Sequence, residues 1–79
     1  MFFKNDKFTV PTKEEIKMLK EKFPSGSRVK LTTMDDPQAP PIGTQGTVTG
    51  VDDIGSIHVN WDNGSRLAVA YPVDMCVVI

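Results

Sequence analysis

The sequence holds one histidine, His58, and one cysteine, Cys76, residue types that act as base and nucleophile in covalent catalysis. A reactive thiol needs an electropositive, partly exposed setting with a base within reach. His58 alternates with Ile57 and Val59, which predicts that it faces solvent from a strand, and Cys76 stands in an apolar run. We therefore expect no catalytic pair and no enzyme activity.

Two pairs of aspartates, Asp35-Asp36 and Asp52-Asp53, raise the question of a cation site. Calcium loops need carboxylates at alternating positions, a spacing that neither pair has. Aspartates next to Pro37 or shortly before Gly55 are typical of turns. The glycines after the proline cluster lead into a strand, whereas phosphate-binding loops lead into a helix. We expect no metal and no cofactor.

Lysines are concentrated at the start of the chain. Residues 1–23 carry a net charge of +2 and residues 24–79 carry −3. Since basic groups that neutralise phosphates supply nonspecific nucleic-acid affinity, the acidic part argues against nucleic-acid binding. The alternative function is a nucleic-acid-associated accessory factor that uses the lysine-rich segment, namely Lys4, Lys7, Lys13, Lys17, Lys20 and Lys22.

The same segment predicts a helix from about Lys13 to Phe23. Thr12 and Glu15 have the spacing of a capping box, and Ile16 and Leu19 share one face with Phe23. Two interpretations of this apolar stripe are open. In the favoured one the stripe packs on the chain's own β domain, and in the other it binds a partner.

After Gly26 the apolar residues alternate, which predicts strands. Asn63-Gly64 between two alternating runs predicts a two-residue type I′ hairpin turn. Tyr71–Asp74 is expected to form a short helical turn before the last strand. The predicted strands cover about 28–32, a segment ending near 51, then 56–61, 65–69 and 75–79.

The last strand is apolar on both faces, so its outer face needs a cover. The N-terminal helix, or Phe2 and Phe3, would serve, and otherwise a homodimer contact is implied. Five short strands with one long loop predict a mainly β fold, a small SH3-like barrel over residues 24–79, preceded by an arm and one α-helix over residues 1–23. An OB-fold is the competing barrel.

Three prolines between residues 34 and 43 forbid an ordinary ladder and predict a long loop after the first strand. In an SH3-like barrel this loop lies on the same side as the turn before the last strand. A groove there would accept an extended basic or proline-containing segment of a partner protein. Trp61, in phase with Ile57, is more simply a core residue. The predicted groove residues are Met34, Asp35, Asp36, Pro37, Pro40, Pro41 and Tyr71.

Residues 24–79 resemble the family of domains of unknown function DUF4314. The segments that carry the resemblance are Pro24-Ser25-Gly26, Arg28-Val29, Met34-Asp35-Asp36-Pro37, Pro40-Pro41-Ile42-Gly43-Thr44, Gly46-Thr47-Val48, Gly55-Ser56-Ile57 and Val59-Asn60-Trp61-Asp62-Asn63-Gly64-Ser65. The resemblance implies a small bacterial protein, often encoded by a phage or mobile element, with no activity assigned. It leaves residues 1–23 outside.

With a single cysteine the chain forms no internal disulfide, which fits a reducing cytoplasm. No apolar run is long enough for a signal peptide or a membrane span. We expect a cytoplasmic monomer or homodimer that acts as a non-catalytic protein-interaction module.

Overall fold

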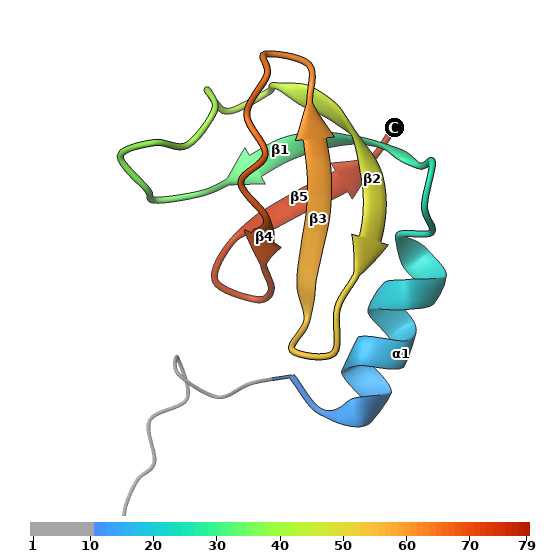
Figure 1. Cartoon of the computed structure of the whole chain (residues 1–79). Coiled ribbons are helices and arrows are strands. Elements are labelled where there is room, and N and C mark those ends of the chain that lie inside the picture. The colour runs from blue at the N-terminus through green and yellow to red at the C-terminus, as the bar shows by residue number, and fades with distance from the viewer. Residues whose placement is uncertain (1–10) are drawn as a thin grey trace, which may run out of the picture.

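The computed structural model describes residues 11–79. It contains one helix and five strands, so the predicted mainly β fold class is confirmed (Figure 1). The proposed cover by Phe2 and Phe3, and the candidate contacts of Lys4 and Lys7, lie outside the described residues. The elements are α1 (Lys13–Lys22), β1 (Arg28–Thr33), β2 (Gln45–Val51), β3 (Ser56–Trp61), β4 (Val69–Ala70) and β5 (Met75–Val78).

The five strands form one antiparallel sheet in the order β4-β3-β2-β1-β5. β1 to β4 are paired in chain order and β5 returns to pair with β1. Among the described residues no ladder joins the end strands β4 and β5, so closure into an SH3-like barrel stays a prediction. β1 and β5 run across the direction of β2 and β3, and in the view of Figure 1 they lie behind β3. Register shifts in β1, after Leu31, and in β2, after Val48, accompany this bend, as β-bulges do in curved sheets.

Helix α1 begins with the predicted capping box. The Glu15 N–H donates to Thr12 Oγ1 at 3.1 Å, and the Thr12 N–H donates to Glu15 Oε1 at 2.8 Å, so two helix-end donors are satisfied. The helix buries Leu19 and Phe23 in the same core as the strands. Packing on the chain's own β domain is therefore confirmed for this stripe.

The predicted alternation places the inward side chains of the strands in one core. Val29 and Leu31 on β1 are fully buried, and Ile57 and Val59 on β3 are buried opposite them. Trp61 is 3 % exposed, and its indole N–H donates to the Leu67 carbonyl at 2.9 Å. Trp61 is thus a core residue with its one donor satisfied, and not part of a groove.

The prediction of a type I′ turn at Asn63-Gly64 is wrong. The Gly64 N–H donates to the Trp61 carbonyl and the Trp61 N–H to the Ser65 carbonyl, which makes a three-residue loop with Gly64 at φ +94°. The Asn63 side chain accepts the Ser65 N–H at 3.0 Å. Asn63 therefore acts through its side chain, and the sequence signal located the hairpin correctly but gave the wrong loop length.

The fourth strand is shorter than predicted, because β4 covers Val69–Ala70 and residues 65–68 are not in a strand. The Leu67 carbonyl is bonded to the Trp61 indole instead of a strand partner. Residues 71–74 form a turn, as expected, but they are not part of a helix. The Asp74 N–H donates to the Ala70 carbonyl four residues earlier at 2.9 Å, and the Tyr71-Pro72 peptide bond is cis.

The end of β5 is poorly covered. Cys76 is buried in the core, whereas Val77 and Val78 of β5 and the following Ile79 are 43 %, 47 % and 54 % exposed. Within residues 11–79 the helix does not cover these side chains, so the expectation that α1 covers the outer face of the last strand is wrong. In the described part of the chain no helix is long and apolar enough to cross a membrane.

Candidate functional site

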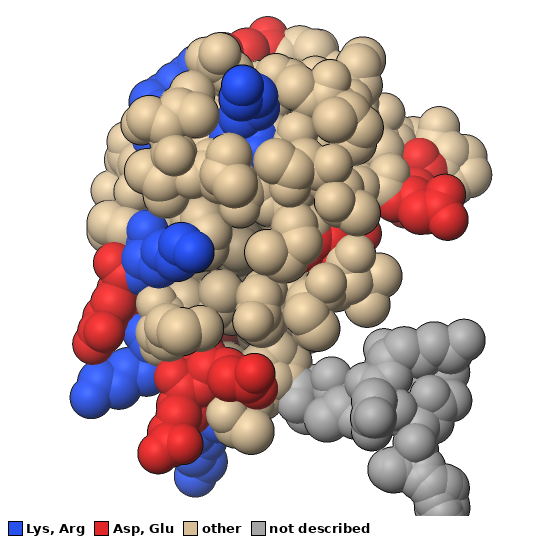
Figure 2. All heavy atoms as spheres, turned by 180° about the vertical axis from the view of Figure 1, so that it is seen from behind, with Lys and Arg blue, Asp and Glu red and all other residues tan. Residues whose placement is uncertain are grey.

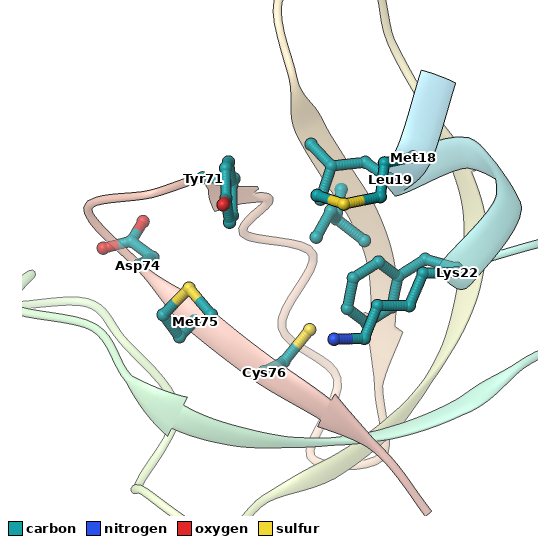
Figure 3. Close-up of a pocket in the computed structure, with 9 residues that line it drawn as sticks. Met18, Leu19, Lys22, Tyr71, Asp74, Met75 and Cys76 are labelled. Atoms are coloured by element: carbon teal, nitrogen blue, oxygen red, sulfur yellow. The ribbon is translucent and has the colours of Figure 1, made fainter. Parts of the chain in front are cut away.

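A hollow of about 110 Å³ opens between α1, the turn after β4 and the start of β5 (Figure 3). Its floor is the protein core, where Leu19, Phe23 and Ile57 contribute buried side chains. We call it the α1–β5 hollow. Its lining therefore combines buried core residues with partly exposed residues of the surrounding elements.

Helix α1 supplies one wall, because Met18 and Lys22 are one helical turn apart and lie on the same side of the helix. Met18 is 48 % exposed, although its neighbour Leu19 is buried. The Lys22 ammonium lies 5.8 Å from the centre of the Phe23 ring, within the range of a cation–π contact. Lys22 thus brings a positive charge to one end of the hollow.

The turn after β4 supplies the opposite wall with Tyr71 and Asp74. The turn is held by two hydrogen bonds. The Asp74 N–H donates to the Ala70 carbonyl at 2.9 Å, and Asp74 Oδ2 accepts the Ala70 N–H at 3.1 Å. Figure 3 shows Asp74 and Lys22 at opposite ends of the hollow, with Tyr71 and Met18 along one side.

Strand β5 forms the remaining side with Met75 and Cys76. Burial raises the pKa of the Cys76 thiol to about 11, although nearby Lys22 lowers it somewhat. The thiol is therefore protonated at neutral pH and serves as a small apolar wall rather than as a nucleophile.

The predicted groove is divided between two neighbouring places. Tyr71 lines the hollow, whereas no residue of the long loop 34–44 does. The loop nevertheless begins beside it, because Thr33 pairs with Met75 in the ladder between β1 and β5. Met34, directly after Thr33, is half-buried against the core.

Inside the loop the acidic and proline residues differ in exposure. Asp35 and Asp36 are exposed, and Asp36 Oδ1 accepts the Gln38 N–H at 2.8 Å, which shapes the turn. Pro40 is buried, whereas Pro37 and Pro41 are exposed. The loop therefore carries exposed acidic groups shortly after Thr33, which pairs with Met75 of the hollow, while Pro40 is buried.

Sequence reasoning missed Met18, Asp74 and Met75 and counted Lys22 only among the lysines of the arm. Met18 adjoins the buried stripe of α1 at Leu19, but periodicity alone does not show whether the edge of such a stripe is covered. Asp74 carried no signal apart from its place in a turn.

The described lysines of α1 do not form a single basic surface. Figure 2 shows blue and red side chains intermixed in this part of the molecule. Lys20 Nζ lies 3.0 Å from Asp53 Oδ1, and Glu14 and Glu21 are interspersed among the lysines. The helix residues named as nucleic-acid candidates are Lys13, Lys17, Lys20 and Lys22, all exposed.

His58 and Asp52 meet on the outer face of the sheet. His58 Nε2 lies 2.9 Å from Asp52 Oδ2, and Asp52 Oδ1 accepts the N–H groups of Ile54 and Ser56. Partial desolvation raises the pKa of Asp52, but the hydrogen bonds from His58, Ser56 and Ile54 lower it more, so the net pKa lies below its usual value. Asp52 thus closes the turn between β2 and β3.

Across the part of the chain that the structure describes, no three His, Cys, Asp or Glu side chains converge as a metal site would require. His58 is exposed on the outer face and Cys76 is buried beneath the hollow. The chemistry that the site offers is an apolar recess with one cationic and one anionic edge.

Comparison with known proteins identifies a family but no activity. A family model described as domain of unknown function DUF4314 matches residues 12–79. The match includes α1, so the expectation that residues 1–23 lie outside the family is wrong for residues 12–23. No curated protein and no solved structure matches this chain.

Proposed function

The chain belongs to the DUF4314 family, a membership that assigns no activity, and from the geometry of the α1–β5 hollow we propose that it is a non-catalytic protein-interaction module. The proposal places it in the cytoplasm, as a factor encoded by a phage or mobile element. Its partner is a protein that contacts the hollow and the adjoining acidic loop.

The observation that carries this proposal is that apolar side chains around the hollow, Met18, Tyr71 and Met75, stay partly exposed. Small domains usually cover such side chains, because burying them provides most of the free energy of folding. Here Tyr71 and Met75 remain partly exposed around a recess whose floor is Leu19 and Ile57. An apolar recess with a few polar groups at its edge is typical of a binding site.

Two observations support a non-catalytic role. Cys76, whose thiol is protonated at neutral pH, has no histidine beside it among the residues that line the hollow. His58 is instead engaged with Asp52 on the outer face. Acid–base or nucleophilic catalysis needs such groups within hydrogen-bond reach of each other.

The alternative, nucleic-acid binding through the lysine-rich segment, has weaker support. On α1 the lysines alternate with glutamates, and Lys20 is paired with Asp53. Nonspecific nucleic-acid binding depends on several basic groups that contact phosphates together.

The test is affinity capture of the tagged protein from nuclease-treated host lysate, compared with the double variant Asp35→Lys, Tyr71→Ala. Asn60→Ala, an exposed position on the outer face of β3, is the control. We expect a near-stoichiometric protein that the wild type and control retain and the double variant loses. Capture unchanged in the double variant contradicts the assigned site, and material that disappears with nuclease supports the alternative.

A further inference from the structure

We propose that the α1–β5 hollow binds one large apolar side chain of an extended partner peptide, with a basic residue on the Asp74 side of this anchor and an acidic residue on the Lys22 side. This inference rests on the proposed function and specifies the chemistry of the partner. It assigns the recognition to Met18, Lys22, Asp74 and Met75 in addition to Tyr71.

The size of the hollow sets the anchor. A dry cavity of about 150 Å³ lined by apolar side chains holds a benzene molecule. The hollow has about 110 Å³ and is open on one side, so a leucine, methionine or phenylalanine side chain fills it, while a second large side chain does not fit. Met18 and Met75 on facing walls suit such an anchor, because methionine adapts its shape to different apolar groups.

The charges at the two ends set what flanks the anchor. Within residues 11–79, Lys22 takes part in none of the ion pairs, and Asp74 uses Oδ2 for the Ala70 N–H while forming no ion pair. The two charged groups stand at opposite ends of the hollow (Figure 3). A carboxylate near Lys22 and a cation near Asp74 complement them, which favours one orientation of the bound peptide.

The acidic loop extends this polarity beyond the hollow. Because Thr33 pairs with Met75, the loop that carries Asp35 and Asp36 leaves the sheet beside the β5 end of the turn that holds Asp74. A peptide that leaves the hollow past Asp74 therefore meets further negative charge. Additional basic residues on that flank should strengthen binding, and additional acidic ones should weaken it.

The probe is the peptide acetyl-GRSFSEG-amide, titrated into the full-length protein labelled with ¹³C at the methionine ε-methyl groups. Met18 and Met75 line the hollow, whereas Met34 does not and serves as the internal control. We expect the Met18 and Met75 signals to move with peptide concentration while Met34 stays in place. Replacing the phenylalanine of the probe with alanine should weaken binding roughly tenfold to a hundredfold, the effect of burying one large apolar side chain.

The charge assignment is tested with Lys22→Gln and Asp74→Asn, which keep the size of each side chain. Each should weaken the probe several-fold and should have no effect on a probe whose arginine and glutamate are both replaced by glutamine. The control Lys17→Gln, a helix position outside the hollow, should change neither. Equal affinity of wild type and both variants for the charged probe overturns the assignment.

The same spectra distinguish other occupants. If Phe2→Ser, Phe3→Ser, Phe8→Ser in the full chain shifts Met18 and Met75 without peptide, the chain's own first residues fill the hollow and the proposal is overturned. Shifts that depend on protein concentration alone would identify a second copy, with the same consequence. The peptide could leave the methyl signals of Met18 and Met75 unchanged while the captured protein is still lost in the variant that lacks Tyr71. In that case this inference fails and the protein-interaction function stands.

Discussion

The outer face of the sheet and the α1–β5 hollow differ in how their charged groups are satisfied. On the outer face the Arg28 guanidinium donates to Thr47 Oγ1 at 3.0 Å and to both carboxylate oxygens of Asp62, at 2.9 and 2.6 Å. At the hollow, Lys22 and Asp74 face an open recess from opposite ends. Among residues 11–79, Arg28 and Asp62 on the outer face pair with each other, whereas Lys22 and Asp74 at the hollow form no ion pair.

The two regions also differ in backbone support. β2 and β3 pair along most of their length, and the tight contact at Gly46 belongs to this pair. The walls of the hollow are built from one face of a short helix, the turn that follows the two-residue strand β4, and the start of β5. Elements with few partners are the ones that can adjust on binding.

The largest effect expected is from Leu19→Ala, because Leu19 joins α1 to the core and forms part of the floor of the hollow. Removing this buried side chain should lower the free energy of unfolding by about 3 kcal/mol. Urea denaturation followed by Trp61 fluorescence measures it. Lys17→Ala, an exposed helix position, is the control and should change stability by less than about 0.5 kcal/mol. A small effect of Leu19→Ala would mean that the helix is not part of the folded core.

Gly46→Ala tests the β2–β3 side of the comparison. A Cβ at Gly46 would lie 2.6 Å from Val59 Cγ1 and 2.8 Å from the Asn60 carbonyl oxygen, and the carbonyl cannot rotate away. We expect a loss of about 2 kcal/mol in the free energy of unfolding. Gly50→Ala in the same strand meets nothing within 4 Å and should be close to neutral. Equal stability of the two variants would contradict close packing here.

Met18→Gln tests whether Met18, at the hollow, contributes to binding or to the stability of the fold. Both residues are good helix formers and position 18 is 48 % exposed, so stability should change by less than about 1 kcal/mol. Binding of the phenylalanine probe should fall several-fold, because an amide replaces an apolar wall. Thermal unfolding and the methyl titration through Met75 measure the two effects. A large loss of stability with unchanged binding would show that Met18 supports the fold instead of a partner.

The smallest effect expected concerns the Arg28–Asp62 pair, which is exposed to solvent. The hydrogen bonds and charge of Arg28 hold the pKa of Asp62 below its usual value. A carboxylate whose pKa is lower in the folded state stabilises the fold above its unfolded pKa of about 3.9 and loses this contribution as the pH falls through the folded pKa. The urea midpoint of Asp62→Asn should therefore fall less steeply below pH 4 than that of wild type. An Asp62 pKa unchanged by Arg28→Ala in a ¹³C carboxyl titration would contradict this.

Much of the fold could be predicted, because the alternation of apolar and polar residues along a strand indicates which side of the strand faces the core. Val29, Leu31 and Ile57 were placed correctly on this basis, and the capping box at Thr12 fixed the start of α1. The hairpin loop at Asn63 was misjudged, since Asn and Gly suit several turn types and the choice depends on bonds from neighbouring strands.

The site was predicted only in part. Tyr71, one of the predicted groove residues, lines the hollow, but its neighbours Met18 and Lys22 come from a helix about 50 positions earlier in the chain. How α1 sits against the turn after β4 is decided by tertiary packing, which leaves no local pattern in the sequence. The acidic loop lies beside the hollow because β1 and β5 pair, another long-range contact.

The most direct test of the central claim, that the hollow and not the outer face meets the partner, is site-specific photocrosslinking in host cells. A benzophenone amino acid would be placed at Tyr71 in one variant and at Asn60 in the other. We predict a discrete, nuclease-resistant protein adduct from position 71 and none from position 60. An adduct from position 60 with none from position 71 would contradict the account.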